Sequence, residues 1–141
     1  MTIEIIQTSQ APDAKPIGLS ITIDSDWTTI IEVPSYLVPE EAFGGTEIVV
    51  PGVAEVISPM ILCNKIETTV TFDLRIFRAE SNTHFTLARN LPILPDDVFF
   101  IPLNGQFIYT GDILEAKCNT AEAIDATISY TIGQAEQDDV V

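Results

Sequence analysis

The feature that most constrains the fold is a period-two alternation of apolar and polar residues, which is typical of strands with one buried face. It is clearest over residues 69–78 and returns over residues 124–132. Isoleucine, valine and threonine together make up 45 of the 141 residues, and β-branched side chains favour strands. Because no segment shows a convincing helical stripe, the sequence predicts an all-β protein.

About eight or nine such segments follow one another at spacings near ten residues, which predicts an antiparallel β-sandwich of Ig-like or jelly-roll type. The alternation predicts these core residues: Val70, Phe72, Leu74, Ile76, Ile128 and Tyr130. It also turns Phe85 and Leu87 inward. Residues 54–64 are expected to form one strand, with a bulge or an edge position at Pro59.

A tight hairpin is predicted at Asn104-Gly105, which separates the apolar runs 98–103 and 106–109. Both turn positions of such a hairpin need a positive φ, and Asn-Gly supplies residues that tolerate it.

The length of 141 residues fits one domain. Residues 1–16 contain two prolines and little periodicity, so we expect an extended N-terminal arm. Residues 17–133 are predicted to form the sandwich, and residues 134–141 an acidic tail.

Charge excludes several classes of partner. Six basic residues face 21 acidic ones, so the formal net charge is −15. Such a surface repels nucleic-acid phosphates and anionic membranes, and we expect neither as a partner. No apolar stretch is long enough for a membrane span, and the N-terminal residues lack the basic start of a signal peptide. We therefore expect a reducing compartment, with Cys63 and Cys118 as free, buried thiols on apolar strands.

Residues that could carry chemistry are few. Asp24 and Asp26 could bind a divalent cation, but turn capping is the favoured interpretation. Asp96, Asp97 and Asp112 also fall in predicted turns. The single histidine, His84, has no evident nucleophile beside it, and the single tryptophan, Trp27, is expected to pack in the core. We therefore predict no enzymatic activity, no cofactor and no zinc site.

The segment 35–52 stands apart, because prolines and glycines interrupt a run rich in large apolar residues. Such residues either fold back onto the sheet or form an exposed patch, and exposed patches mark binding surfaces. We expect a short strand over residues 47–50 and an interface made by Tyr36, Leu37, Val38, Phe43 and Ile48. An extra hairpin that completes the sandwich is the alternative.

Five sequence segments, taken in their order along the chain, carry a resemblance to a known group of proteins. These are TTIIEVP (28–34), VISPMILCN (56–64), TTVTFDLRIFR (68–78), NLPILPDD (90–97) and GDILEAKCNTAEAIDATISYTI (111–132). Their order resembles small β-sandwich virion structural proteins of tailed bacteriophages, including cyanophage-type ones. Gly111-Asp112 and Ser129-Tyr130 are its most specific parts, and the segment 35–52 departs from the pattern.

The resemblance implies a structural part of the virion, assembled in the host cytoplasm and accessory to the head–tail neck, the tail or a fibre. Its partners would be other virion proteins and further copies of itself, since virion parts form symmetric assemblies. Two alternatives remain open at this point. One is a decoration protein on the capsid exterior, and the other is a carbohydrate-binding adhesion module that uses Trp27 beside Asp24 and Asp26.

The charge gives a first testable prediction. At about 0.1–0.15 M salt and micromolar concentration, the purified protein should not retard duplex DNA in a gel, because the net charge repels phosphates. A basic protein of similar size serves as the positive control. A retarded band that disappears on raising the salt would contradict the prediction.

Overall fold

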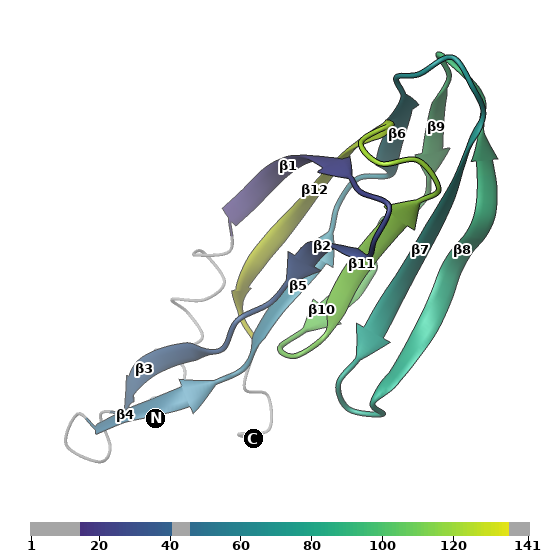
Figure 1. The fold of residues 1–141 in the computed structure, drawn as a ribbon. Coiled ribbons are helices and arrows are strands. Elements are labelled where there is room, and N and C mark those ends of the chain that lie inside the picture. The colour runs from purple at the N-terminus through teal and green to yellow at the C-terminus, as the bar shows by residue number, and fades with distance from the viewer. Residues whose placement is uncertain (1–14, 41–45, 136–141) are drawn as a thin grey trace.

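The structure is a computed structural model that describes residues 15–40 and 46–135, and within these residues it is all-β, with twelve strands. In chain order they are β1 (Lys15–Ile23), β2 (Thr28–Glu32), β3 (Tyr36–Glu40), β4 (Thr46–Val50), β5 (Gly52–Val56), β6 (Met60–Asn64), β7 (Val70–Arg78), β8 (Thr83–Ile93), β9 (Val98–Ile101), β10 (Phe107–Tyr109), β11 (Ile113–Cys118) and β12 (Ile124–Gln134). The predicted fold class is confirmed (Figure 1).

The first sheet contains six strands in four antiparallel rows. Two of the rows are single strands, and each of the other two consists of two strands that follow one another in line. β1 pairs along one side of β12, while β5 and β6 pair with successive parts of its other side. β10 then pairs with β5, and β9 with β6. The rows are therefore β1, β12, β5–β6 and β10–β9, and the last of these forms an edge of the sheet.

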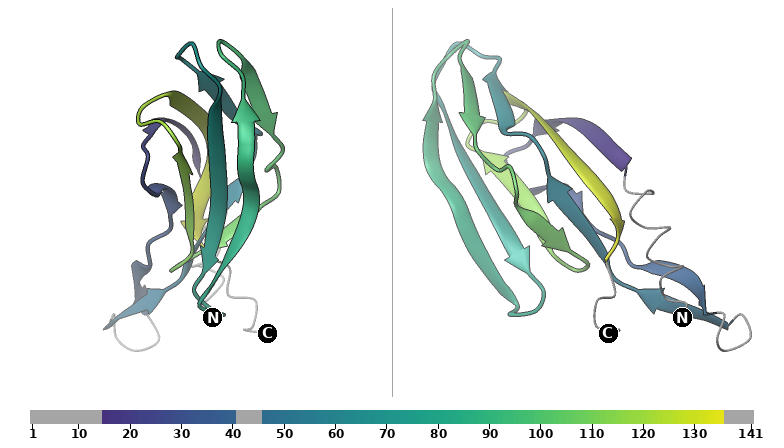
Figure 2. Two further views of the ribbon diagram at one scale, coloured as in Figure 1. Left: turned by 45° about the vertical axis from the view of Figure 1, so that its right-hand side comes forward. Right: turned by 180° about the vertical axis from the view of Figure 1, so that it is seen from behind.

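The second sheet has the order β2-β11-β7-β8, and it lies against the first (Figure 2). Numbered along the chain, the eight rows take the order 1-8-3-6 in the first sheet and 2-7-4-5 in the second. This arrangement is the jelly roll of two Greek keys, so the pairing decides between the two predicted sandwich types. The β3–β4 hairpin is inserted between the second and third rows.

The core lies between the sheets and follows the period-two alternation. Five of the six predicted core residues are buried: Val70, Phe72, Leu74, Ile76 and Ile128. The sixth, Tyr130, is half-buried and packs against the core cluster. β7 thus supplies four of the confirmed positions, and it is an inner row of the second sheet, between β11 and β8.

Phe85 and Leu87 were predicted to be part of the inward face, but neither is buried, since they are 48% and 37% exposed. β8 is an edge row of the second sheet, and its register against β7 shifts twice. Leu87 falls within one of these shifts. Phe85 lies opposite the buried Ile76 and shares its face, but it lines a surface hollow with Arg78 and Tyr109 instead of packing in the core.

The hairpin predicted at Asn104-Gly105 is also wrong. Gly105 does adopt the positive φ expected of it, at +88°. However, its N–H donates to the carbonyl of Val56, and the Val56 N–H donates to the carbonyl of Gln106. The chain therefore continues along the same row from β9 to β10 instead of reversing, because β5–β6 offers both segments a partner.

The single strand predicted over residues 54–64 is divided. Residues 57–59 separate β5 from β6, and Pro59, which has no N–H, lies in this interruption. The interruption lies opposite the one between β9 and β10.

The predicted domain limits stay a prediction, and the first and last described strands end near them. β1 begins at Lys15, two residues before the expected start of the sandwich, and β12 ends at Gln134. Most of the predicted arm and tail, residues 1–14 and 136–141, lies outside the described residues. In the described part of the chain, no helix has the length and hydropathy needed to cross a membrane.

The core gives a second prediction. Phe72→Ala should lower the free energy of unfolding by about 3–5 kcal/mol, because Phe72 is fully buried and the truncation leaves a cavity. Phe100→Ala is the matched control, since Phe100 is 55% exposed, and it should cost about 1 kcal/mol or less. Urea denaturation followed by circular dichroism measures both. Equal losses would show that the inward face is misassigned.

Candidate interaction surface

The β3–β4 hairpin forms a two-stranded sheet of its own, which projects from one end of the sandwich (Figure 1). Leu37 lies opposite Val49, and these two side chains are 64% and 65% exposed. On the other face Val38 lies opposite Ile48, and Val38 is buried while Ile48 is half-buried. The hairpin therefore presents an exposed apolar face made by Leu37 and Val49.

The root of the hairpin is fixed to the sandwich. The Thr110 hydroxyl donates to the carbonyl of Pro34 at 3.0 Å and accepts from the Gly52 N–H at 2.6 Å. A Cβ at Gly52 would lie 2.6 Å from the Pro34 carbonyl oxygen and 2.7 Å from Cε2 of Tyr36. Only glycine fits such a close approach of two chain segments, so the hairpin leaves the sandwich in a set direction.

The expected strand over residues 47–50 is confirmed within β4, whereas the predicted interface residues divide between the two faces. Leu37 is exposed, Tyr36 and Ile48 are half-buried, and Val38 is 6% exposed. Phe43 lies outside the described residues. Their role as an interface stays a prediction. The predicted interface did not include Val49, the exposed residue opposite Leu37. The sequence alone does not place these two residues on one face, because that depends on the register of the hairpin.

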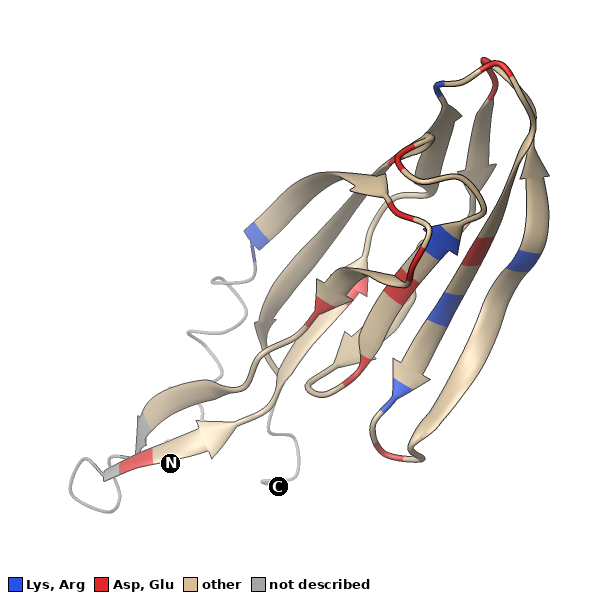
Figure 3. Cartoon of the chain, in the orientation of Figure 1, with Lys and Arg blue, Asp and Glu red and all other residues tan. Residues whose placement is uncertain are grey.

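A second apolar surface was not anticipated from the sequence. Along the edge row of the first sheet, Val98, Phe100, Phe107 and Tyr109 are 44–55% exposed. We call these four residues the β9–β10 stripe. The rings of Phe107 and Tyr109 stack, with centroids 6.3 Å apart. The sequence signal that could have found this surface is the run 98–109, which contains no charged residue (Figure 3).

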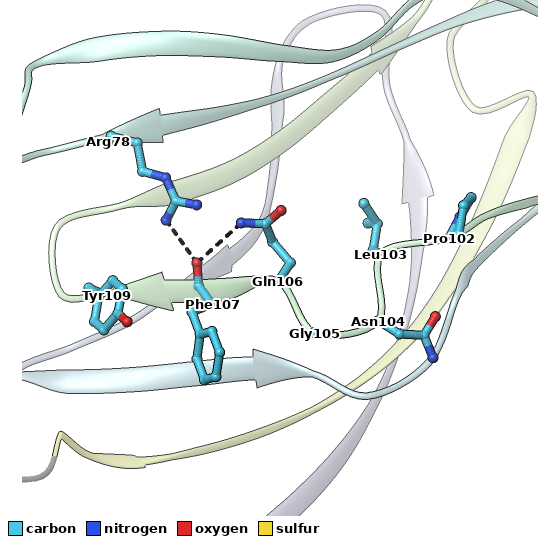
Figure 4. A pocket seen from close by; sticks show the side chains of 8 residues that line it. All are labelled: Arg78, Pro102, Leu103, Asn104, Gly105, Gln106, Phe107 and Tyr109. Carbon is cyan, nitrogen blue, oxygen red and sulfur yellow. Dashed lines mark hydrogen bonds between the residues drawn. The ribbon is translucent and has the colours of Figure 1, made fainter.

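A small hollow lies beside this stripe, but internal contacts occupy its main polar groups. It has a volume of about 360 Å³ and is lined by Arg78, Pro102, Leu103, Asn104, Gly105, Gln106, Phe107 and Tyr109 (Figure 4). The carbonyl of Phe107 accepts from Nη1 of Arg78 at 2.8 Å and from Nε2 of Gln106 at 3.5 Å. These side chains thus close the outer edge of β10 at this point.

Asp112, one of the predicted turn carboxylates, is 4% exposed and fully engaged. It accepts from Nη1 of Arg78 and from the backbone N–H groups of Ala79 and Tyr109, each at 2.9 Å. A carboxylate with three donors is a structural tie, because its oxygens are directed at fixed partners. Asp97 also caps its turn, by accepting from the Val98 N–H at 2.9 Å.

Trp27 does not pack in the core as predicted. It precedes β2, is half-buried, and lies under two cations on the outer face of the second sheet. The guanidinium of Arg75 is 3.8 Å from its ring centroid and Nζ of Lys117 is 4.8 Å away. Arg75 also pairs with Glu115, and His84 lies 3.8 Å from the same carboxylate. The cations hold the ring by cation–π attraction.

Asp24 and Asp26 lie in the turn before β2, as predicted. Oδ1 of Asp24 accepts from the Ser25 N–H at 2.7 Å, and the carbonyl of Asp26 accepts from the Thr28 hydroxyl at 3.1 Å. Among the described residues, no three histidine, cysteine or acidic side chains are grouped so that they could hold a metal ion.

The two cysteines are free, as expected, but the burial predicted for both is wrong for Cys63, which lies on the outer face of β6. Cys63 lies half-buried on β6, while Cys118 is 3% exposed in the core. Burial raises the pKa of the Cys118 thiol, because the thiolate loses hydration there. Burial likewise raises the pKa of Tyr130, with a smaller contribution from Tyr36.

The sequence matches no protein-family model and no curated protein. A chain of the infectious bursal disease virus particle is 9% identical with a TM-score of 0.40, over 86% of this chain and 31% of the viral chain. This chain therefore spans about a third of that viral protein.

Carbohydrate-binding proteins are similar at the same level. The modules CBM22-1 and GH10 of a Clostridium thermocellum xylanase, in complex with xylohexaose, give 12% identity and a TM-score of 0.37, over 84% of this chain and 28% of that one. A family 29 carbohydrate-binding module gives 16% identity and a TM-score of 0.28, over 90% of this chain and 97% of the module. The function of this chain has to be derived from its own surface.

The thiols give a third prediction. In the native protein at about pH 8, a thiol reagent should modify Cys63 much faster than Cys118, because the thiolate is the reactive form and burial disfavours it. Denaturant should equalise the two. In a Cys63→Ser control, native labelling should almost vanish. Rapid modification of Cys118 in that control, without unfolding, would contradict its placement in the core.

Proposed function

We propose that this protein is a structural component of a virus particle that works by protein–protein assembly. The observation that carries the proposal is the exposed apolar face of a hairpin that belongs to neither sheet of the sandwich. A protein alone in water gains nothing from exposing Leu37 and Val49, whereas a neighbouring subunit can cover them.

The more specific form of the proposal follows the phage resemblance. We propose a tailed-phage part, accessory to the neck, the tail or a fibre, that assembles in the host cytoplasm without enzymatic activity. The Gly111-Asp112 pair that the resemblance shares has a structural role. A Cβ at Gly111 would lie 2.8 Å from Cβ of Ala79, so a larger residue does not fit there. A net charge of −15 keeps a free subunit soluble and away from packaged DNA.

Two alternatives are a capsid decoration protein and a carbohydrate-binding module that uses Trp27, and the structure supports the first better than the second. A capsid decoration protein would use the same hairpin, and immunogold labelling of intact particles distinguishes a capsid location from one at the neck or tail. Carbohydrate binding through Trp27 is less well supported, because Arg75 and Lys117 already lie over its ring. The Asp24 carboxylate of that arrangement is engaged in its own turn.

The fourth prediction tests the hairpin. Changing Leu37 and Val49 together to serine should leave the urea midpoint of the free protein nearly unchanged, because both side chains are exposed. Incorporation into particles should fall at least tenfold, as judged by immunoblots of particles from host cells in which the variant gene replaces the wild-type gene.

The matched control is Leu94→Ser, because Leu94 is 54% exposed and lies outside the hairpin. It should be incorporated normally. Normal incorporation of the hairpin variant would refute a role for this face in assembly. Particles that never contain the wild-type protein would refute the virion proposal as a whole.

A further inference from the structure

A second hollow lies beside the one described above and shares Arg78 and Tyr109 with it. It has a volume of about 500 Å³ and is lined by Arg78, Glu80, Ser81, Phe85, Tyr109, Thr110 and Asp112. These residues come from the ends of β7 and β10, from the start of β8 and from the turns that follow β7 and β10. We call it the Phe85 hollow. Its volume is within the range of small-molecule sites, about 300–1,000 Å³.

Aromatic residues from both sheets line the Phe85 hollow. Phe85 belongs to β8 of the second sheet and Tyr109 to β10 of the first, and they are 48% and 49% exposed. Phe107 extends this lining into the neighbouring hollow, because its ring stacks on that of Tyr109. Exposed rings beside a hollow offer flat apolar faces on which a ligand can pack.

Polar groups without a partner also line this hollow. Arg78 uses Nη1 for its hydrogen bonds to the Phe107 carbonyl and to Asp112, while its Nε and Nη2 donate to no other described residue. Within the part of the chain that the structure describes, no hydrogen bond or ion pair engages the Glu80 carboxylate or the Ser81 hydroxyl. Free donors and acceptors therefore lie together, which suits a ligand whose groups do both, as hydroxyls do.

The charges around the hollow favour a neutral ligand. The Arg78 charge is balanced by Asp112, at 2.9 Å, so Glu80 is left as an unpaired charge. Glu55 adds a carboxylate beside Phe107, which it faces across the β5–β10 pair. An anion would meet these carboxylates on a chain with a net charge of −15, whereas a cation would meet the Arg78 guanidinium.

We propose that the Phe85 hollow binds a neutral saccharide. The sugar rings pack on Phe85 and Tyr109, and the sugar hydroxyls bind the free groups of Arg78, Glu80 and Ser81. Sugar C–H groups are apolar enough to pack on aromatic faces, while each hydroxyl both donates and accepts. A purely apolar ligand would cover the free polar groups without giving them partners, which costs free energy.

This site is separate from the surfaces considered above. Trp27 lines neither hollow, and neither do Leu37 and Val49 of the hairpin. Saccharide binding at the Phe85 hollow therefore needs neither the Trp27 arrangement nor a role in a virus particle.

A glycan array that displays neutral oligosaccharides and their sialylated forms tests the proposal with the full chain. The wild type should bind neutral glycans and should not prefer the sialylated forms. Titration calorimetry with the best-bound neutral glycan then measures the affinity. This affinity should change less than about twofold between about 0.05 and 0.5 M salt, because no ion pair forms with the ligand.

Variants locate the binding site. Phe85→Ala and Tyr109→Ala should each weaken binding about tenfold or more, because each removes a ring on which the saccharide packs. Both side chains are exposed, so the fold should persist, as circular dichroism verifies. Phe100→Ala is the matched control, since Phe100 is an exposed aromatic residue that lines neither hollow. It should bind like the wild type, and so should Trp27→Ala.

Three results would overturn the proposal. They are a wild type that binds no glycan, a wild type that prefers sialylated glycans, or folded Phe85→Ala and Tyr109→Ala variants that bind as the wild type does. Loss of binding in Trp27→Ala alone would also contradict it, because carbohydrate recognition would then belong to the outer face of the second sheet. Incorporation into particles is measured separately, so the virion proposal is unaffected by these outcomes.

Discussion

The structure depends on the mutual burial of two apolar sheet faces, each of which would be exposed without the other. The core draws its residues from both sheets, and β7, β11 and β12 each contribute buried residues at every second position. Burial of large side chains such as Phe72 and Leu62 supplies the main favourable free energy of folding. The jelly-roll order meets this requirement with successive rows that change sheet, except at β7 and β8, which pair with each other in the second sheet.

Two buried polar side chains tie the sheets together at opposite ends of β7. Before its start, Nδ2 of Asn64 donates to the carbonyls of Thr68 and Ile93, at 2.9 and 3.0 Å. At its other end, Asp112 accepts from Arg78, Ala79 and Tyr109. Because unpaired polar groups in a core are costly, these satisfied contacts specify how the ends of the sheets meet.

Basic residues and exposed apolar residues lie on different parts of the molecular surface. Four of the six cations, Arg75, Arg78, Arg89 and Lys117, belong to strands of the second sheet (Figure 3). The first sheet carries the β9–β10 stripe, and the hairpin carries the Leu37 and Val49 face. A strongly acidic protein with two separate apolar surfaces is suited to contacts with more than one neighbour, as assembly in a particle requires.

The sequence by itself determined the strand content and the buried positions of β7, because alternation is a local property of a half-buried strand. It also marked the segment 35–52 as unusual through its breakers and large apolar residues. Only the tertiary structure decided that Asn104-Gly105 continues a row, that Phe85 lies at an open edge, and that Trp27 is covered by cations. These outcomes depend on which strands are neighbours, and strand pairing joins residues that are distant in the sequence. The β9–β10 stripe likewise needed the register, since the spacing of Phe100 and Phe107 alone gives no face.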